Sequence, residues 1–357
     1  MQKSDGMNYA PKGRPAPVVQ RGEFAFAAAA LDHGHIFGMA NGLAEAGGVC
    51  KYVYDADPKK AEAFAAQYPE AKIARSLDEI LLDKDVRMVA AAAVPNLRGP
   101  LGLKVMDAGK DYFTDKTPFT AMEQLFAARE KCARTGRRYM VYYSERVHTE
   151  CGVCAGYLIK DGVIGDVIQV LGTGPHRLNA PSRPDWFFRK EQYGGILCDI
   201  GSHQAEQFLY YAGAKDAKVM YSQVGNFAHP EYPELEDFGD ATLVADNGAA
   251  NYFRVDWFTP DGLKSWGDGR AFILGTKGFM ELRKYTNIGV DGEGDQIFLA
   301  TEKGEEVLRV AGKIGFPFFG ELILDCLERT EKAMTQEHAF KAAELCLEAQ
   351  AKAVRIK

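Results

Sequence analysis

Residues 24–58 read FAFAAAALDHGHIFGMANGLAEAGGVCKYVYDADP, and their pattern indicates the fold class of the N-terminal part of the chain. Residues 24–30 are a short apolar run that ends in a turn, which predicts a buried strand of a parallel sheet. A helical pattern over 36–46 stops at two glycines, and residues 49–54 predict a second strand that ends at Asp55. The stretch therefore predicts a β-α-β unit.

The same alternation of strands and helices continues to about residue 143. Asp57 and Pro58 are typical of a helix N-cap and first helical position, and Ser76 with Glu79 forms a capping box. Further strands are predicted at 86–94, 112–114 and 139–143, and further helices at 58–68, 76–82, 101–108 and 122–135. This order predicts a parallel sheet with right-handed crossovers, as in a Rossmann dinucleotide-binding domain.

After residue 150 the pattern changes to short strands separated by turns. A helix is expected at 151–160 and a helical tail at 321–354, broken near Thr335. Strands are expected at 167–171, 217–227, 240–245, 249–258, 271–274 and 278–282. The fold class is therefore α/β, with a second α/β domain built on a large open, mainly antiparallel sheet. We predict a flexible or partner-embracing arm at 1–22, a Rossmann NAD(P)-binding domain at 23–145, and a second α/β domain at 146–357.

Composition limits the class of protein. The chain has 357 residues, 46% hydrophobic residues and a formal net charge of -6. Such a chain favours two domains, and its acidic balance argues against a nucleic acid partner. No apolar run approaches the roughly 20 residues of a membrane span, and no secretory leader is recognised. Seven scattered cysteines, including the Cys151–Cys154 pair, fit packing in a reducing cytoplasm better than disulfides or zinc.

The turn after the first strand is where G-x-G-x-x-G belongs in a Rossmann domain, but Ala30, Asp32 and His35 take the glycine positions. An ionised Asp32 at about 4 Å would repel a pyrophosphate by about 1 to 4 kcal/mol. We therefore expect Asp32 to cap the helix while His33 or His35 donates to phosphate oxygens. No metal site is predicted, because two histidines spaced i, i+2 at a helix start are not expected to converge.

Polar residues follow three other predicted strands. Asp55 is placed to accept hydrogen bonds from the adenosine ribose, which favours NAD over NADP. The alternative is that it is a turn aspartate. Pro95 and Asn96 either line the ligand crevice or form a turn. Lys116, preceded by Asp115, either stabilises a developing alkoxide or is a surface lysine.

Residues 194–203, GGILCDIGSH, carry the strongest signal for chemistry. Asp199 and His203 are spaced i, i+4, so one helical face can present both. A neutral histidine suits removal of a hydroxyl proton during alcohol oxidation, and Asp199 would orient the ring or bind a second hydroxyl. The alternative is a buried pair that caps the helix.

Together these residues give a resemblance to the Gfo/Idh/MocA family over about residues 23–355. The matching segments are Asp55-Ala56-Asp57-Pro58, Val94-Pro95-Asn96, Asp115-Lys116-Thr117-Pro118, Asp161-Gly162-Val163-Ile164-Gly165-Asp166 and the stretch from Gly194 to His203. The resemblance implies a catalytic group of Lys116, Asp199 and His203. It also implies that 146–357 is a substrate-binding and oligomerisation domain, with a homodimer or homotetramer built through its open sheet. Cofactor or substrate contacts are implied at Arg146, His176, Arg177 and Trp186.

The sequence departs from the family pattern at the lost glycines, at Ile196 and at Phe187. Three functions stay open. The first is an NAD(P)-dependent oxidoreductase acting on a secondary alcohol of a sugar, glycoside or cyclitol. Its NAD is either released at each turnover or bound tightly enough to survive dialysis. The second is redox-neutral elimination, epimerisation or glycoside cleavage through a transient keto intermediate. The third is a non-catalytic ligand sensor.

Overall fold

The computed structural model describes residues 5–290 and 292–357. Contacts divide the chain into two compact units. The Rossmann unit comprises residues 7–142 and 316–340, and the sheet unit comprises the described residues before Met7 together with 143–315 and 341–357. The first unit thus includes a segment from near the C-terminus that the domain boundaries expected from sequence did not assign to it.

The Rossmann unit is built on a six-stranded sheet in the order β3-β2-β1-β4-β5-β6, and every pair in it is parallel. Its strands are β1 (Ala25–Ala29), β2 (Val49–Tyr54), β3 (Lys72–Ile73), β4 (Val86–Ala91), β5 (Asp111–Asp115) and β6 (Tyr139–Tyr142). Its helices are α1 (His35–Glu45), α2 (Pro58–Gln67), α3 (Leu77–Leu82), α4 (Pro95–Asp107), α5 (Met122–Thr135) and α11 (Pro317–Glu328). The strand order reverses between β1 and β4, which is where such sheets bind ligands.

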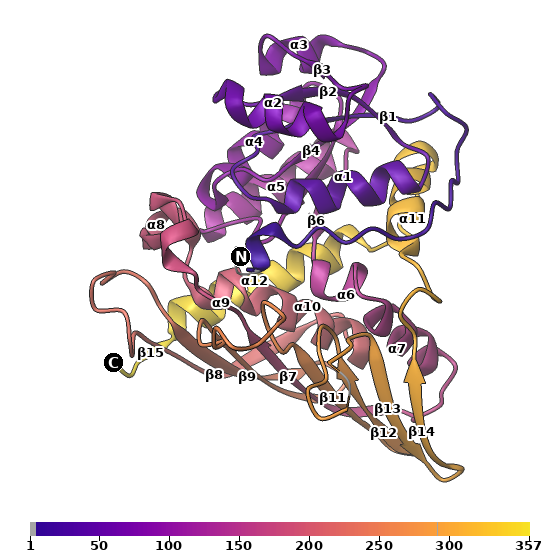
Figure 1. The fold of residues 1–357 in the computed structure, drawn as a ribbon, viewed down its shortest axis with the longest axis vertical. Helices are drawn as coiled ribbons and strands as arrows, with labels where there is room; N and C mark the ends of the chain where they lie inside the picture. Colours follow the sequence, from indigo (N-terminus) through magenta and orange to yellow (C-terminus); the bar gives the residue numbers. More distant parts are fainter. Residues whose placement is uncertain (1–4, 291) are drawn as a thin grey trace. The chain divides into compact units, whose positions relative to one another are not determined.

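Local sequence explains these elements. All five residues of β1 are buried, as expected of a central parallel strand. Asp57 caps α2 by accepting the Lys59 N–H, and Ser76 caps α3 by accepting the Glu79 N–H. The predicted Rossmann domain is therefore confirmed. Figure 1 shows β1–β6 and α1–α5 in the upper, indigo-to-magenta part of the ribbon, and α11 in yellow-orange.

The N-terminal arm lies along α1 from residue 7 onward. The side-chain amide of Asn41 donates to the carbonyls of Ala10 and Pro11, and the Gly13 N–H donates to the Glu45 carboxylate at 2.9 Å. The Ala16 N–H donates to the Glu45 carbonyl at 2.9 Å. This part of the arm is thus hydrogen-bonded to its own Rossmann unit, whereas residues 1–4 lie outside the described part of the chain.

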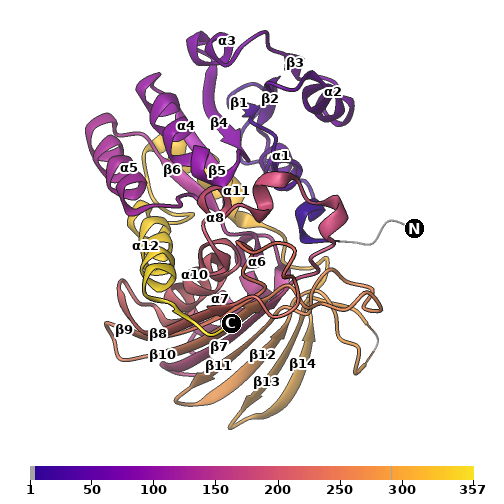
Figure 2. The ribbon, with the colours of Figure 1, turned by 90° about the vertical axis from the view of Figure 1, so that its left-hand side faces the viewer.

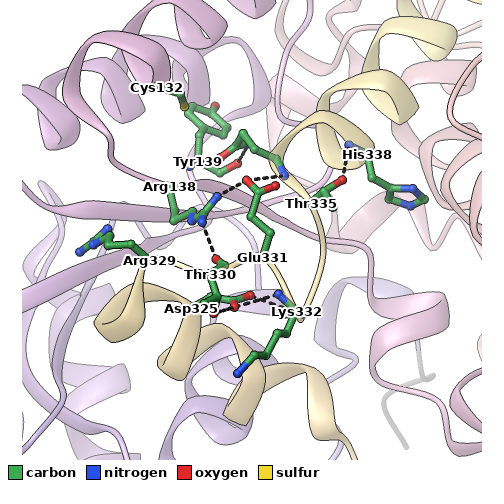
Figure 3. A network of polar contacts seen from close by, with 12 residues as sticks. Cys132, Arg138, Tyr139, Asp325, Arg329, Thr330, Glu331, Lys332, Thr335 and His338 are labelled. Atoms are coloured by element: carbon green, nitrogen blue, oxygen red, sulfur yellow. Dashed lines mark hydrogen bonds and ion pairs between the residues drawn. The ribbon is translucent and has the colours of Figure 1, made fainter.

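The segment after α11 is tied to β6 by the polar network in Figure 3. Arg138 forms an ion pair with Glu331 and donates to the Thr330 carbonyl. The Asp325 carboxylate accepts the Lys332 N–H at 2.8 Å, which fixes the turn after α11. These contacts explain why residues near the C-terminus complete the Rossmann unit.

The sheet unit contains a nine-stranded sheet in the order β14-β13-β12-β11-β7-β10-β9-β8-β15, antiparallel except at β7–β10 and β8–β15. Its strands are β7 (Val167–Pro175), β8 (Ala217–Gly225), β9 (Phe238–Ala245), β10 (Ala250–Asp256), β11 (Arg270–Gly275), β12 (Gly278–Arg283), β13 (Gln296–Thr301), β14 (Gly304–Arg309) and β15 (Val354–Arg355). Its helices include α6 (Ser144–Val147), α7 (Glu150–Lys160), α8 (Lys190–Tyr193), α9 (Ile196–Asp199) and α10 (Gly201–Ala212), and α12 (Gln336–Lys352) ends in it.

The large, mainly antiparallel sheet is confirmed. Figure 2 shows α10 and α7 over one face of this sheet, while no helix of the described residues covers the opposite face. Large apolar side chains on β7, β10, β11 and β12 remain exposed, among them Leu171, Tyr252, Phe272 and Phe279. Among the described residues, no helix combines the length and the apolar character that a membrane crossing needs.

Candidate active site

The turn from β1 into α1 brings two histidines onto one buried carboxylate. His35 Nδ1 lies 2.9 Å from Asp115 Oδ1, and His33 Nδ1 lies 3.4 Å from Asp115 Oδ2. The Arg98 guanidinium lies 3.2 Å from the same carboxylate, and the His35 N–H donates to His33 Nδ1 at 3.2 Å. All four side chains are buried, so they form one hydrogen-bonded cluster at the carboxyl end of the sheet.

The expectation that His33 and His35 do not converge is wrong. His33 precedes the helix, so helical spacing does not separate the two rings, whose centroids are 4.2 Å apart. Burial opposes ionisation of Asp115, but His35 and Arg98 outweigh it and hold its pKa well below the usual range. Burial and the neighbouring His35 hold the pKa of His33 well below 6.5. Arg98 already supplies the cation beside Asp115, so we assign no metal to this cluster.

Asp32 does not cap α1, contrary to expectation, since the helix start has no side-chain cap. Its Oδ1 lies 2.6 Å from Lys60 Nζ, and its Oδ2 accepts the Val94 N–H at 3.3 Å. The negative charge at the second glycine position is therefore balanced by Lys60. This pairing removes the main electrostatic objection to a pyrophosphate near the turn.

Asp55 stands at the end of β2, as predicted, and is half-buried. Its Oδ2 accepts the Leu31 N–H at 2.6 Å and its Oδ1 accepts the Asp57 N–H at 2.8 Å. Each carboxylate oxygen has a second lone pair, so Asp55 can still accept from ribose hydroxyls. Asp57 caps α2 as expected, which leaves Asp55 free of that role.

Three other predicted residues follow β4 and β5. Pro95 occupies the first turn of α4, and the buried Oδ1 of Asn96 has no hydrogen-bond partner among the residues that the structure describes. Lys116 is 5% exposed and therefore is not a surface lysine. Arg98 donates to the carbonyls of Lys116 and Thr117, which fixes the backbone of the segment that carries this lysine.

These residues fit a nicotinamide dinucleotide. Asp55 suits the adenosine ribose, and the buried Oδ1 of Asn96, unpaired among the described residues, suits a donor at the β1–β4 switch point. The N-cap residue of α1 is Gly34, which has no side chain. A Cβ on Gly34 would lie 2.4 Å from the Met7 carbonyl oxygen, so the arm closes over this first turn.

Asp199 and His203 lie at the α9–α10 junction of the sheet unit. They are 9% and 1% exposed, and the Asp199 carbonyl accepts the Ser202 hydroxyl at 2.8 Å. The His203 N–H donates to the Ile200 carbonyl, and its ring lies edge-on to Tyr143 with centroids 6.5 Å apart. Lys116 belongs to the Rossmann unit, so the three residues of the predicted catalytic group are divided between the two units.

The other predicted contact residues have partners within the sheet unit. Arg146 pairs with Glu206 at 2.5 Å and stacks on Tyr210 at 3.8 Å. Arg177 donates to the carbonyls of Pro260, Leu263 and Ser265 and so holds that loop. Roles for Arg146 and Arg177 in substrate binding stay predictions.

Two further candidates, His176 and Trp186, have ring contacts within this unit. His176 follows β7 and packs on Trp266, with ring centroids 4.4 Å apart. Trp186 lies in the short 3-10 helix Asp185–Phe188, is half-buried and contacts Phe187. Sequence reasoning missed a third residue, Glu145 in α6, which is 1% exposed and lies 3.9 Å from His176 Nε2. Its partners are far away in sequence, so no local pattern could have revealed it.

Comparisons with known proteins agree with this arrangement. Residues 38–143 match the model of an oxidoreductase family with an NAD-binding Rossmann fold. Residues 155–281 match the model of the GFO/IDH/MocA C-terminal domain. The chain therefore has the two-domain organisation of a nicotinamide-dependent oxidoreductase.

Individual relatives narrow the class further. A crystal structure from Erwinia carotovora atroseptica, of a protein assigned as an oxidoreductase, shares 47% identity, covers 94% of this chain and 100% of its own, and superposes with a TM-score of 0.91. The scyllo-inositol 2-dehydrogenase (NAD(+)) of Bacillus subtilis is 27% identical over 64% of this chain and 65% of its own length. Levoglucosan dehydrogenase in complex with NADH and levoglucosan has the same fold, with a TM-score of 0.74 at 18% identity over 92% of this chain and 97% of its own. The chain belongs to the Gfo/Idh/MocA family.

Proposed function

We propose that the protein is an NAD-dependent dehydrogenase that oxidises or reduces a secondary alcohol carbon of a sugar, glycoside or cyclitol. The observation that carries this proposal is the burial of both Asp199 and His203 at the α9–α10 junction, in a chain whose other unit is an NAD-binding Rossmann domain. The inositol and levoglucosan dehydrogenases among its relatives support a polyhydroxylated substrate.

In this proposal the polar side chains have different roles in the reaction. The nicotinamide supplies the hydride acceptor when it is bound. His203 takes the hydroxyl proton as general base, and Asp199 orients the imidazole or holds a second hydroxyl. Lys116 stabilises the oxygen as it develops negative charge, because a buried ammonium acts strongly where water is excluded. His176 and Trp186 are proposed substrate and cofactor contacts, respectively.

We further propose that NAD is preferred over NADP and is held tightly. The Asp55 carboxylate would repel a 2′-phosphate, and the arm lies over the first turn of α1. Cofactor that survives extensive dialysis would support tight binding, whereas an apo protein that exchanges NAD freely would contradict it. All seven cysteines are free thiols, in keeping with the cytoplasmic location that we propose.

The open face of the nine-stranded sheet supports a homodimer or homotetramer. Cross-strand neighbours Leu171, Tyr252 and Phe272 form an exposed apolar row on it. A second copy of this chain is the partner that we propose for this face. Phe272→Asp should shift the mass measured by light scattering toward the monomer, and an unchanged oligomer would rule out this interface.

The experiment for the proposed function is a panel of sugars and cyclitols with NAD and NADP. We expect NADH and a keto product, and we expect Lys116→Ala and His203→Ala to lose turnover while circular dichroism shows a folded protein. Products formed without net NADH would instead indicate redox-neutral chemistry. Undiminished turnover in either variant would remove that residue from the mechanism.

A further inference from the structure

Two side chains from distant parts of the chain hold the start of α9. The Glu236 carboxylate, which is 0% exposed, accepts the Ile196 N–H at 3.0 Å. The side-chain oxygen of Gln350, in α12, accepts the next N–H, that of Leu197, also at 3.0 Å. The N-cap residue of α9 is Gly195, which has no side chain, so these two acceptors satisfy the first N–H groups of the helix instead.

The two acceptors are also bonded to each other. Gln350 Nε2 donates to both carboxylate oxygens of Glu236, at 3.1 and 3.0 Å. Lys190 forms an ion pair with the same carboxylate, and the Glu236 N–H donates to the Tyr193 hydroxyl at 3.0 Å. Gln350 makes both of its contacts only when its amide oxygen faces Leu197 and its amide nitrogen faces Glu236. Glu236 and Gln350 thus form one hydrogen-bonded pair, the α9 clamp.

The close approach of Gln350 explains one glycine of the 194–203 segment. Gly195 has a φ of 94°, and a Cβ at this position would lie 2.3 Å from the Gln350 amide. Any other residue would therefore strain the backbone and push Gln350 away from Leu197. Glycine at this position is thus required for the α9 clamp to close.

Backbone hydrogen bonds connect the clamped residues to the proposed catalytic side chains. The Asp199 N–H donates to the Gly195 carbonyl at 2.9 Å. The Ile200 N–H donates to the Ile196 carbonyl at 3.0 Å, and the His203 N–H donates to the Ile200 carbonyl at 3.1 Å. A shift at the start of α9 is therefore passed on to both Asp199 and His203.

We propose that Glu236 and Gln350 are positioning residues that hold Asp199 and His203 in place for the reaction. The proposal rests on the proposed function. Proton transfer depends steeply on the distance and angle between the base and the hydroxyl, and a displacement of about 1 Å can cost about 100-fold in rate. Loosening the α9 clamp should therefore lower kcat, whereas the affinity for NAD, which the Rossmann unit is expected to bind, should stay the same.

The test exchanges the two functional groups of the clamp in the full chain. Glu236→Gln places an NH2 group against the NH2 group of Gln350 and against Lys190, and Gln350→Glu places two carboxylates against each other. The double variant again pairs one carboxylate with one amide and keeps an acceptor for both N–H groups. We expect each single variant to lower kcat by about 10- to 100-fold and the double variant to recover to within about threefold of the wild type.

Glu150→Gln is the matched control. The Glu150 carboxylate is also buried, and it accepts the N–H groups of Ile314 and Gly315 at 2.9 and 2.6 Å, outside the 194–203 segment. We expect this control to lower the midpoint of urea unfolding, as the single clamp variants do, but to leave kcat unchanged. Single clamp variants whose kcat equals that of the control would overturn the proposal, because the clamp would then only stabilise the fold.

Hydrogen exchange tests the clamp without turnover. We expect the amides in peptides that cover residues 194–203 to exchange on the order of tenfold faster in each single variant, and at nearly the wild-type rate in the double variant. Unchanged exchange in the single variants would overturn the proposal, whatever their activity. If one single variant does not fold, the other single variant and the double variant carry the same comparison.

The two readouts separate this inference from the proposed function. If exchange follows the expected pattern but the wild-type chain oxidises or reduces no sugar or cyclitol, the proposed function fails and the catalytic role of the clamp fails with it. If the wild-type chain is active and the single variants exchange faster at full kcat, the proposed function stands and the positioning role is overturned.

Discussion

Lys60 Nζ lies 2.6 Å from Asp32 Oδ1, and this ion pair joins α2 to the turn between β1 and α1. The second oxygen of Asp32 accepts the Val94 N–H after β4. An acidic residue thus occupies a position where Rossmann domains usually have glycine, and a lysine from the next helix balances its charge. The loss of glycine at position 32 is therefore compensated in part by this ion pair.

Removing the lysine should weaken dinucleotide binding. Lys60→Met leaves the Asp32 carboxylate unbalanced near the pyrophosphate, and we expect roughly threefold to tenfold weaker NAD binding by calorimetry, because the pair is partly exposed. Lys59→Met is the matched control, since Lys59 is exposed and adjacent in sequence. Equal affinities for the two variants would show that Asp32 does not act on the cofactor.

Neutralising Asp55 should change the choice between cofactors. Asp55→Asn keeps an acceptor for the Leu31 N–H but removes the charge that repels a 2′-phosphate. We expect the ratio of the NADP Kd to the NAD Kd to fall by about tenfold, a difference of about 1.4 kcal/mol. An unchanged ratio would mean that Asp55 only shapes the turn.

His33 should make the Rossmann unit sensitive to mild acid. Its pKa is lowered in the folded protein, so below pH 6.5 the unfolded chain binds a proton that the folded chain does not. The free energy of unfolding therefore keeps its full His33-dependent contribution above pH 6.5. Below pH 6.5 it falls by up to about 1.4 kcal/mol per pH unit. His33→Asn should flatten this loss in urea unfolding curves relative to His338→Asn, and parallel curves for the two variants would refute the effect.

Gly42 permits a close contact between α1 and α11. A Cβ at this position would lie 2.4 Å from the ring of Phe319. Gly42→Ala should therefore lower the free energy of unfolding by about 1 to 3 kcal/mol, because overpacking forces side chains or backbone to shift. Gly262→Ala is the control, since nothing lies within 4 Å of its Cβ position. A Gly42 variant as stable as the control would show that Phe319 moves aside without cost.

Local patterns predicted much of the fold. Residues 49–54 and 122–135 form their predicted strand and helix with the same bounds, because each segment is amphipathic or apolar and ends at strong turn or cap residues. Helix α4 begins at Pro95 instead of residue 101. Pro95 was expected to line the ligand crevice or form a turn, but it occupies the first turn of the helix, where proline is well tolerated. Strands β13 and β14 were not expected. The edge strand β14 contains charged residues such as Glu305 and Glu306, which are more typical of a loop.

The candidate site was less predictable, because its contacts join distant segments. Asp32 was expected to cap its own helix but pairs with Lys60 of the next one. His33 and His35 meet on Asp115, which lies 80 residues beyond His35 in the chain. Glu145 pairs with Lys284, 139 residues away. Spacing within one helix cannot reveal such pairs, since the sheet topology creates them.

We propose that this chain is a working nicotinamide-dependent oxidoreductase despite its altered β1–α1 turn. The most direct measurement is mass spectrometry and absorbance of the nucleotide released from the purified, denatured protein, with NAD and NADP titrations of any empty fraction. The account predicts bound nicotinamide or saturable NAD binding that is tighter than NADP binding. Protein that holds no nicotinamide and binds neither nucleotide would contradict it and would favour a ligand sensor with an oxidoreductase fold.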